Sequence, residues 1–220
     1  RPLLRNPETA ERILGTRGMQ SRGQHLPDGG PLRETTDAHT ALKSWLGSAQ
    51  YGMRRDILAI GPLTNIARLV QDAPELAQNI TRLIWMGGSD GAGNHSALAE
   101  FNALADPDAA AIVAKAGLPL DVVDLMFCRT VAFGPDQLPR TDPLTADLLG
   151  GYLDIGLTRG RPTMSIYDPL AALVASQPDA FEYRRCDMSV SVALNATQGQ
   201  TTFNHTTNGS TRLVVGTTLE

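Results

Sequence analysis

Three short apolar segments alternate with segments of helical spacing in the middle of the chain, and this alternation restricts the fold most strongly. The apolar segments cover residues 56–60, 81–86 and 119–125 and are typical of buried strands. Helical spacing predicts helices at 36–50, 65–71, 74–79 and 107–115. Strands that alternate with helices usually pair in parallel, so the pattern predicts an α/β fold with an open, mixed but mostly parallel sheet flanked by helices.

The remaining segments extend this pattern toward both ends. Further helices are predicted at 143–158 and 169–176. The β-rich segments 187–194 and 211–217, with a loop between them, are predicted to add edge or antiparallel strands. Residues 1–37 are rich in Gly, Pro and Arg and predict a loop. With 220 residues the chain can bury a substantial core, and we expect a single domain over residues 1–220.

The composition argues against several classes of partner. Apolar residues make up 42% and charged residues 19%, as in ordinary globular proteins. The net charge is -4, so we expect no nucleic-acid partner, and no apolar run approaches the roughly 20 residues that cross a bilayer. Cys128 and Cys186 are too few for a disulfide framework or a zinc cluster, and two free thiols favour a cytoplasmic protein.

A polar pair precedes the helix predicted at 107–115. Glu100 and Asn102 are two residues apart, and the sequence Asp106-Pro107 is typical of a helix N-terminus. In an extended segment the two side chains would leave the same face about 7 Å apart. They would then offer donors and acceptors to adjacent hydroxyls of a sugar. The alternative is a polar loop in front of a capped helix.

Two other polar segments stand at the starts of predicted helices. At 61–67, Thr64 or Asn65 would cap the following helix, or a backbone carbonyl held open in the turn would bind a hard cation such as Ca²⁺. At 166–172, Asp168 would cap a helix beside a half-buried Tyr167. Ligands of parallel sheets bind beyond the carboxyl ends of the strands, so the segments at 61–65, 86–88 and 100–102 are expected at one edge.

Taken together, these segments resemble the inosine–uridine nucleoside hydrolase family. The resemblance rests on segments in matching order: GPLTNIA at 61–67, MGG at 86–88, GN at 93–94, AEFN at 99–102 with DP at 106–107, and DPL at 168–170. It extends over nearly the whole chain. It implies Ca²⁺-dependent hydrolysis of the N-glycosidic bond of ribonucleosides to ribose and free base, as in nucleoside salvage.

The resemblance also implies roles for individual residues. Thr64 would give its backbone carbonyl and Asp168 its carboxylate to the metal ion. The residues that would surround the sugar are Glu100, Asn102 and Asn94, by hydrogen bonds to ribose hydroxyls, and Met86, by lining the site. Carboxylates around a held ribose would stabilise the positive charge that develops as the base leaves. A homodimer or homotetramer is the expected assembly.

The sequence departs from the family in two places. Tyr167 stands where members often have a histidine that protonates the leaving base, and a tyrosine is a poorer acid at neutral pH. Tyr167 would therefore contact the base or only fill space. The family's N-terminal cluster, Asp-x-Asp-x-x-x-Asp-Asp, is not found, and Leu14-Gly15 stands where the family's glycine-rich active-site loop often has His-Gly.

That cluster supplies most calcium ligands and the catalytic base in the family. We therefore expect the chain to lack the family's first strand, the aspartate motif and the catalytic base, and to be inactive by itself. Two alternatives remain open: a domain that binds a ribosyl ligand without catalysis, and an inactive fragment.

Overall fold

The computed structural model describes residues 1–14, 18, 21–27, 29–31, 36–48, 52–140 and 142–219. Their contacts divide into two compact units. The first unit comprises Arg1–Pro7, Thr36–Cys128 and Tyr167–Glu220, and the second comprises Glu8–Thr35 and Arg129–Ile166. The prediction of a single domain over residues 1–220 stays a prediction.

The first unit is built on a sheet that has six strands among the described residues. Its strands are β1 (Asp56–Ala59), β2 (Arg82–Met86), β3 (Leu120–Val123), β6 (Phe181–Val190), β7 (Thr201–His205) and β8 (Thr211–Thr217). Their order across the sheet is β1-β2-β3-β8-β6-β7. β1, β2, β3 and β8 are parallel, whereas β6 runs antiparallel to both β7 and β8. The predicted open, mixed and mostly parallel sheet is confirmed.

The helices of this unit precede β1 or lie between strands in the sequence. They are α2 (Ala38–Gly47), α3 (Thr64–Asp72), α4 (Pro74–Ala77), α5 (Phe101–Ala105), α6 (Pro107–Lys115), α7 (Leu125–Cys128), α9 (Asp168–Ser176) and the 3₁₀ turn η2 (Pro178–Ala180). The predicted helix 107–115 agrees with α6 at both ends. The predicted end of the helix at 36–50 falls partly on residues 49 and 50, which lie outside the described residues.

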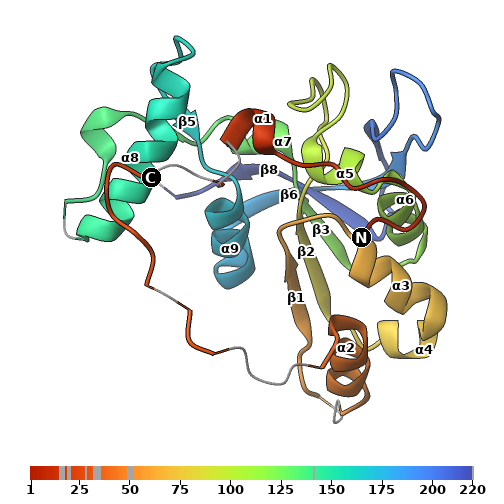
Figure 1. The fold of residues 1–220 in the computed structure, drawn as a ribbon. Coiled ribbons are helices and arrows are strands. Elements are labelled where there is room, and N and C mark those ends of the chain that lie inside the picture. The colour runs from red at the N-terminus through yellow and green to blue at the C-terminus, as the bar shows by residue number, and fades with distance from the viewer. Residues whose placement is uncertain are drawn as a thin grey trace. The chain divides into compact units, whose positions relative to one another are not determined.

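Different helices cover the two faces of this sheet (Figure 1). Side chains alternate along a strand, so Leu83 and Trp85 point to one face and Arg82 to the other. Leu83 and Trp85 belong to the main hydrophobic core, which also contains residues of α3 and α6. Arg82 donates hydrogen bonds to the carbonyls of Val174 and Ala175 in α9. α9 therefore packs on the opposite face from α3 and α6.

The second unit has a small core of its own. It contains α1 (Glu11–Leu14), β4 (Ala132–Phe133), the 3₁₀ turn η1 (Pro135–Gln137), α8 (Pro143–Leu157) and β5 (Met164–Ser165). β4 and β5 pair antiparallel, and Phe133, Leu153 and Met164 pack together. The Arg22 guanidinium lies 2.6 Å from the carboxylate of Asp154 in α8. This ion pair attaches the segment at 21–27 to α8.

Several predicted loops contain regular structure. The loop expected at 1–37 includes the helical turn α1, while 15–17, 19–20, 28 and 32–35 lie outside the described residues, among them Gly15. The loop expected after residue 194 contains β7, which pairs with β6. The β-rich segment expected at 187–194 overlaps only the end of β6, which begins earlier, at Phe181, and ends at Val190. In the part of the chain that the structure describes, no helix is long and apolar enough to cross a membrane.

Candidate functional site

The carboxyl group of Glu100 is buried at the N-terminus of α5. Its Oε1 accepts the backbone N–H of Asn102 at 2.9 Å, and its Oε2 accepts that of Ala103 at 3.1 Å. Oε2 also accepts the N–H of Gly88 at 2.9 Å, from the loop that follows β2. Only 2% of Glu100 is exposed. The side chain therefore caps α5 and holds the loop after β2 against it.

Burial changes the acidity of this carboxyl group. Desolvation raises the pKa of Glu100 from 4.5 to about 7, although three backbone N–H groups favour the ionised form. The negative charge of Asp168 adds to the rise. At neutral pH the group therefore titrates between the neutral and the ionised form. Shifts of this size are common at functional sites, because burial and like charge are concentrated there.

Asn102 is attached to the end of β2. Its Nδ2 donates a hydrogen bond to the Met86 carbonyl at 2.9 Å and lies 3.7 Å from the Met86 sulfur. Both residues are buried. The structure therefore brings Met86, Glu100 and Asn102 together at the carboxyl end of a parallel strand, where ligands of such sheets bind.

The geometry expected for this pair is wrong, because the segment is not extended. Glu100 occupies the N-cap position and Asn102 lies in the first turn of the five-residue helix α5. The carboxylate of Glu100 bonds to the N–H groups of that turn, which stabilises the helical conformation. The two side chains are held in place by the cap and by the Met86 carbonyl rather than by the alternation of a strand.

Asn94 lies in the loop between β2 and α5, and its side chain is bound to the start of the helix. Its Oδ1 accepts the N–H of Phe101 at 2.9 Å, and the backbone N–H of Asn94 donates to Ala99 at 3.2 Å. A Cβ atom on Gly93 would lie 2.3 Å from the Ala99 carbonyl oxygen. Glycine is therefore required where this loop folds back on itself. Asn94 itself is exposed.

Thr64 follows β1 at the same carboxyl edge of the sheet. Its hydroxyl donates to Asp106 Oδ2 at 2.6 Å, and the same oxygen accepts the N–H of Leu3 at 2.9 Å. Asp106 is fully buried and caps α6 through its Oδ1 and the N–H of Ala109. The predicted capping by Thr64 or Asn65 is wrong, because the N-cap position of α3 is Leu63 and has no side-chain cap.

Asp168 begins α9 and Tyr167 precedes it. The predicted N-cap role of Asp168 is wrong, since Tyr167 occupies the N-cap position without a side-chain cap bond. Asp168 is half-buried, and burial raises its pKa. Its charge acts on both Glu100 and Cys128. Asp168 is therefore electrostatically coupled to the Glu100 site, with the half-buried Tyr167 as its neighbour in sequence.

Asp124 is a buried acid that the sequence did not single out, and it lies near the buried Cys128 thiol. Asp124 follows β3, caps α7 through the N–H of Phe127 and accepts the N–H of Asp90 at 2.7 Å. Burial raises its pKa. Burial also raises the pKa of Cys128 to about 12, with the charges of Asp124, Glu100 and Asp168 adding to the rise. The strand predicted at 119–125 contained Asp124, whereas β3 ends at Val123; the charged residue within the apolar segment was the available signal for an earlier end.

Comparison with known proteins decides the family. A family model described as inosine-uridine preferring nucleoside hydrolase matches residues 1–219. The chain belongs to this family. It is 33% identical over 206 residues to the non-specific ribonucleoside hydrolase RihC of Escherichia coli (strain SMS-3-5 / SECEC). That alignment covers 91% of this chain and 66% of the relative, so the chain spans slightly less than two thirds of its length.

Solved structures of nucleoside hydrolases have the same fold. A purine-preferring ribonucleoside hydrolase from Gardnerella vaginalis superposes with a TM-score of 0.80 at 26% identity, covering 94% of this chain and 69% of that one. A plant nucleoside hydrolase superposes with a TM-score of 0.83 at 22% identity, covering 96% of this chain and 71% of that one. The predicted family and fold are thus confirmed for this chain.

The described residues do not form a complete site for the Ca²⁺ that is expected in a nucleoside hydrolase. Ca²⁺ takes six to eight oxygen ligands. No group of three or more His, Cys, Asp or Glu side chains in the described part of the chain is placed to hold a metal ion. Asp168 and the Thr64 carbonyl would together supply only two ligand groups, and the Thr64 hydroxyl is already bonded to Asp106.

Proposed function

We propose that the protein hydrolyses the N-glycosidic bond of ribonucleosides, releasing ribose and free base, and that Glu100, Asn102 and Met86 form its ribose-binding region. The observation that carries this proposal is the buried Glu100 carboxyl group, held next to the Asn102 amide at the carboxyl end of β2. A charged group and an amide buried together are costly unless they serve a polar ligand or a fixed structure. Membership of the nucleoside hydrolase family supports ribose as that ligand.

The bonds of Glu100 leave capacity for a substrate. A carboxylate has about four lone-pair positions, and three backbone N–H groups occupy three of them. The remaining position would accept a ribose hydroxyl. The amide nitrogen of Asn102 donates to the carbonyl and to the sulfur of Met86, and its side-chain oxygen would accept from a neighbouring hydroxyl. Asn94, which is exposed in the loop between β2 and α5, is proposed as a further contact to the sugar.

The charges in this region suit the reaction. As the base leaves, positive charge develops on the sugar ring, and nearby carboxylates stabilise it. Asp168 and Glu100 interact electrostatically, which concentrates negative charge at this place. Interactions that strengthen as the sugar becomes cationic lower the barrier of the chemical step. Tyr167, beside Asp168 in sequence, is proposed to contact the leaving base.

We propose that hydrolysis of the N-glycosidic bond depends on Ca²⁺ in the protein that the gene encodes. Asp168 and the Thr64 carbonyl would contribute two ligand groups, and the described residues do not complete the site. A bound Ca²⁺ would polarise water and hold ribose hydroxyls. The expected homodimer or homotetramer and the cytoplasmic location stay predictions.

The test is the release of free base from a panel of purine and pyrimidine ribonucleosides by that protein, with Ca²⁺ and with a chelator. We expect Ca²⁺-dependent release and a loss of at least about tenfold in kcat/KM in Glu100→Ala and in Asn102→Ala. The control is Glu75→Ala, on the exposed surface of α4. Full activity in both site variants would contradict the proposed site. Tyr167→Phe tests the base contact, because it removes only the hydroxyl and should alter the preference among bases.

A second candidate function is ribonucleoside binding without catalysis. It is favoured by the incomplete set of metal ligands among the described residues. Saturable binding of a ribonucleoside that Asn102→Ala weakens, without release of free base at any Ca²⁺ concentration, would select this alternative.

A further inference from the structure

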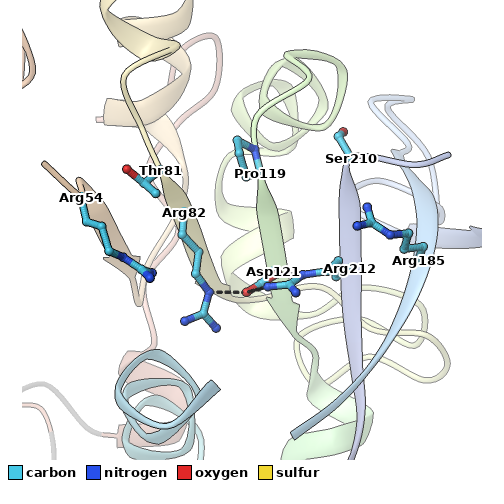
Figure 2. Close-up of a pocket in the computed structure, with 8 residues that line it drawn as sticks. All are labelled: Arg54, Thr81, Arg82, Pro119, Asp121, Arg185, Ser210 and Arg212. Carbon is cyan, nitrogen blue, oxygen red and sulfur yellow. Dashed lines mark hydrogen bonds and ion pairs between the residues drawn. The ribbon is translucent and has the colours of Figure 1, made fainter. Parts of the chain in front are cut away.

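A pocket of about 340 Å³ opens at the end of the sheet opposite to the Glu100 site. Thr81, Pro119 and Ser210 line it, and each directly precedes one of the parallel strands β2, β3 and β8 (Figure 2). The pocket therefore lies at the amino ends of these strands. The two ends of β2, Arg82 and Met86, are about 13 Å apart by strand geometry. This pocket is distinct from the proposed ribose-binding region.

Arginines dominate the lining of the pocket. Arg54, Arg82, Arg185 and Arg212 contribute to it, and the carboxylate among the lining residues is Asp121 (Figure 2). Asp121 pairs in register with Arg212 of β8, which pairs in register with Arg185 of β6. Residues in register on neighbouring strands point to the same face. The sheet itself therefore places these three charged side chains in one row.

The existing ion pairs leave this row positively charged. Asp121 accepts from Arg82 Nε at 2.5 Å and from Arg212 at 2.7 and 2.8 Å, so both of its oxygens are used. Arg54 is paired with Asp56 outside the row. The guanidinium of Arg185 forms no ion pair with a described residue, and it donates one hydrogen bond, to the Gly209 carbonyl.

The guanidinium groups of this pocket differ in their exposure to water. Asp121 is the single carboxylate beside three guanidinium groups of the lining, and it bonds to Arg82 and Arg212 but not to Arg185. The Arg82 side chain is 7% exposed and that of Arg212 is 34% exposed, whereas Arg185 is exposed. Like charges directly opposite each other destabilise an antiparallel pair, as Arg185 and Arg212 are here. Packing of Arg212 over the Tyr183 ring at 4.3 Å stabilises one of them. An anion between the two arginines would offset the remaining repulsion.

We propose that this pocket binds a small anion that carries a phosphate group. The planar fork of a guanidinium can donate two parallel hydrogen bonds to phosphate oxygens, and Arg54, Arg185 and Arg212 line this pocket. Arg82 also lines it, but all three of its nitrogens already donate to Asp121 and to carbonyls of α9. The hydroxyls of Thr81 and Ser210 add neutral donors at the rim. The volume is at the lower end of that of small-molecule sites, so it suits a phosphate group with a short attached moiety.

The test is calorimetric titration of the 220-residue chain with inorganic phosphate and with pyrophosphate, at an ionic strength held constant with chloride. We expect saturable binding of both, tighter for pyrophosphate because it presents more oxygens and charge. Arg185→Gln should weaken both affinities about tenfold or more, the usual effect of losing a charge-assisted hydrogen bond.

The matched control is Arg184→Gln. It removes the same charge from the neighbouring residue of β6, whose side chain points to the other face and pairs with Asp90. We expect the affinities of this variant for phosphate and pyrophosphate to stay within about twofold of wild type. The charge of Arg184 lies on the other face of the sheet, and its effect on the pocket is largely screened by salt. Arg54→Gln, whose side chain is 66% exposed, is a second pocket variant that should also weaken binding. Absence of saturable binding, or equal weakening by Arg184→Gln and Arg185→Gln, would overturn the proposal.

Discussion

The carboxylate of Glu100 accepts the backbone N–H of Gly88 across 2.9 Å, and this bond joins the start of α5 to the end of β2. Gly88 has a φ of +71°, a left-handed conformation that favours glycine. A Cβ atom there would lie 3.1 Å from the Thr201 side chain. The position of the proposed ribose-binding region therefore depends on one buried acid and on the glycine that it contacts.

Replacement of Glu100 should destabilise the fold as well as impair activity. Glu100→Ala removes the acceptor of three backbone N–H groups, and we expect the free energy of unfolding to fall by about 3 kcal/mol. Glu100→Gln keeps one acceptor oxygen and should cost less. Urea denaturation measures both, with Glu75→Ala as an exposed control expected within about 0.5 kcal/mol of wild type. A Glu100→Ala protein as stable as that control would contradict the capping role.

The raised pKa of Glu100 predicts how stability depends on pH. A carboxyl group with a pKa of 4.5 when unfolded and about 7 when folded binds its proton more tightly in the folded state. Its contribution to stability is complete below about pH 4.5 and is lost as the pH rises to about 7. The loss amounts to about 3 kcal/mol at most.

Urea denaturation at a series of pH values checks this expectation. Stability should fall across this pH range in the wild type and fall less steeply in Glu100→Gln, which does not titrate. Asp124 and Asp168, whose pKa values are also raised, add slopes of the same sign in both proteins. Parallel profiles for the two proteins would show that Glu100 does not titrate in this range.

Thr64 allows a structural role to be separated from a role in metal binding. Thr64→Val removes the hydroxyl bonded to Asp106, and we expect a loss of about 2 kcal/mol in the free energy of unfolding. The main-chain carbonyl proposed as a Ca²⁺ ligand is retained, so the Ca²⁺ concentration for half-maximal activity should change little. Thr64→Ser, which keeps a hydroxyl, is the matched control. A large shift in Ca²⁺ requirement in Thr64→Val alone would assign the hydroxyl a direct part in the metal site.

Asp168 should act on its neighbours through its charge. Asp168→Asn removes a negative charge that raises the pKa of Glu100, so that pKa should move down toward its ordinary value. NMR titration of the Glu100 carboxyl carbon measures the shift. The free energy of unfolding should not fall, because burial disfavours the ionised form of Asp168. An unchanged Glu100 pKa would mean that the two groups are not coupled.

The thiols should be inert in the folded protein. Cys128 and Cys186 are both buried, and burial raises both pKa values, that of Cys128 to about 12. The thiolate is the reactive form, so its population at neutral pH is negligible. We expect an aromatic disulfide reagent to modify neither cysteine within minutes, and both after denaturation in urea. Rapid native-state labelling of Cys128 would show that this region opens to solvent.

Elements with a strong local signal agree with their predictions. The helix α6 was expected at the residues where it lies, because Asp106-Pro107 marks its start and small apolar residues continue it. The strand β8 likewise agrees with the β-rich segment 211–217. In contrast, α5 was missed because five residues carry little periodicity. Its N-terminus is stabilised by Glu100, which is in turn fixed by Gly88, twelve residues earlier in the sequence.

The order of helices and strands along the chain could thus be predicted from hydrophobic periodicity, from turn residues and from the family's polar segments. These signals act over a few neighbouring positions. The partners of the polar side chains were decided by the folded chain alone. Thr64 bonds to Asp106, and Asp121 pairs with two arginines from other strands, at separations of 39 to 91 residues. Such contacts, and the burial that raises the pKa of Glu100, exist only once distant strands and helices pack together and exclude water.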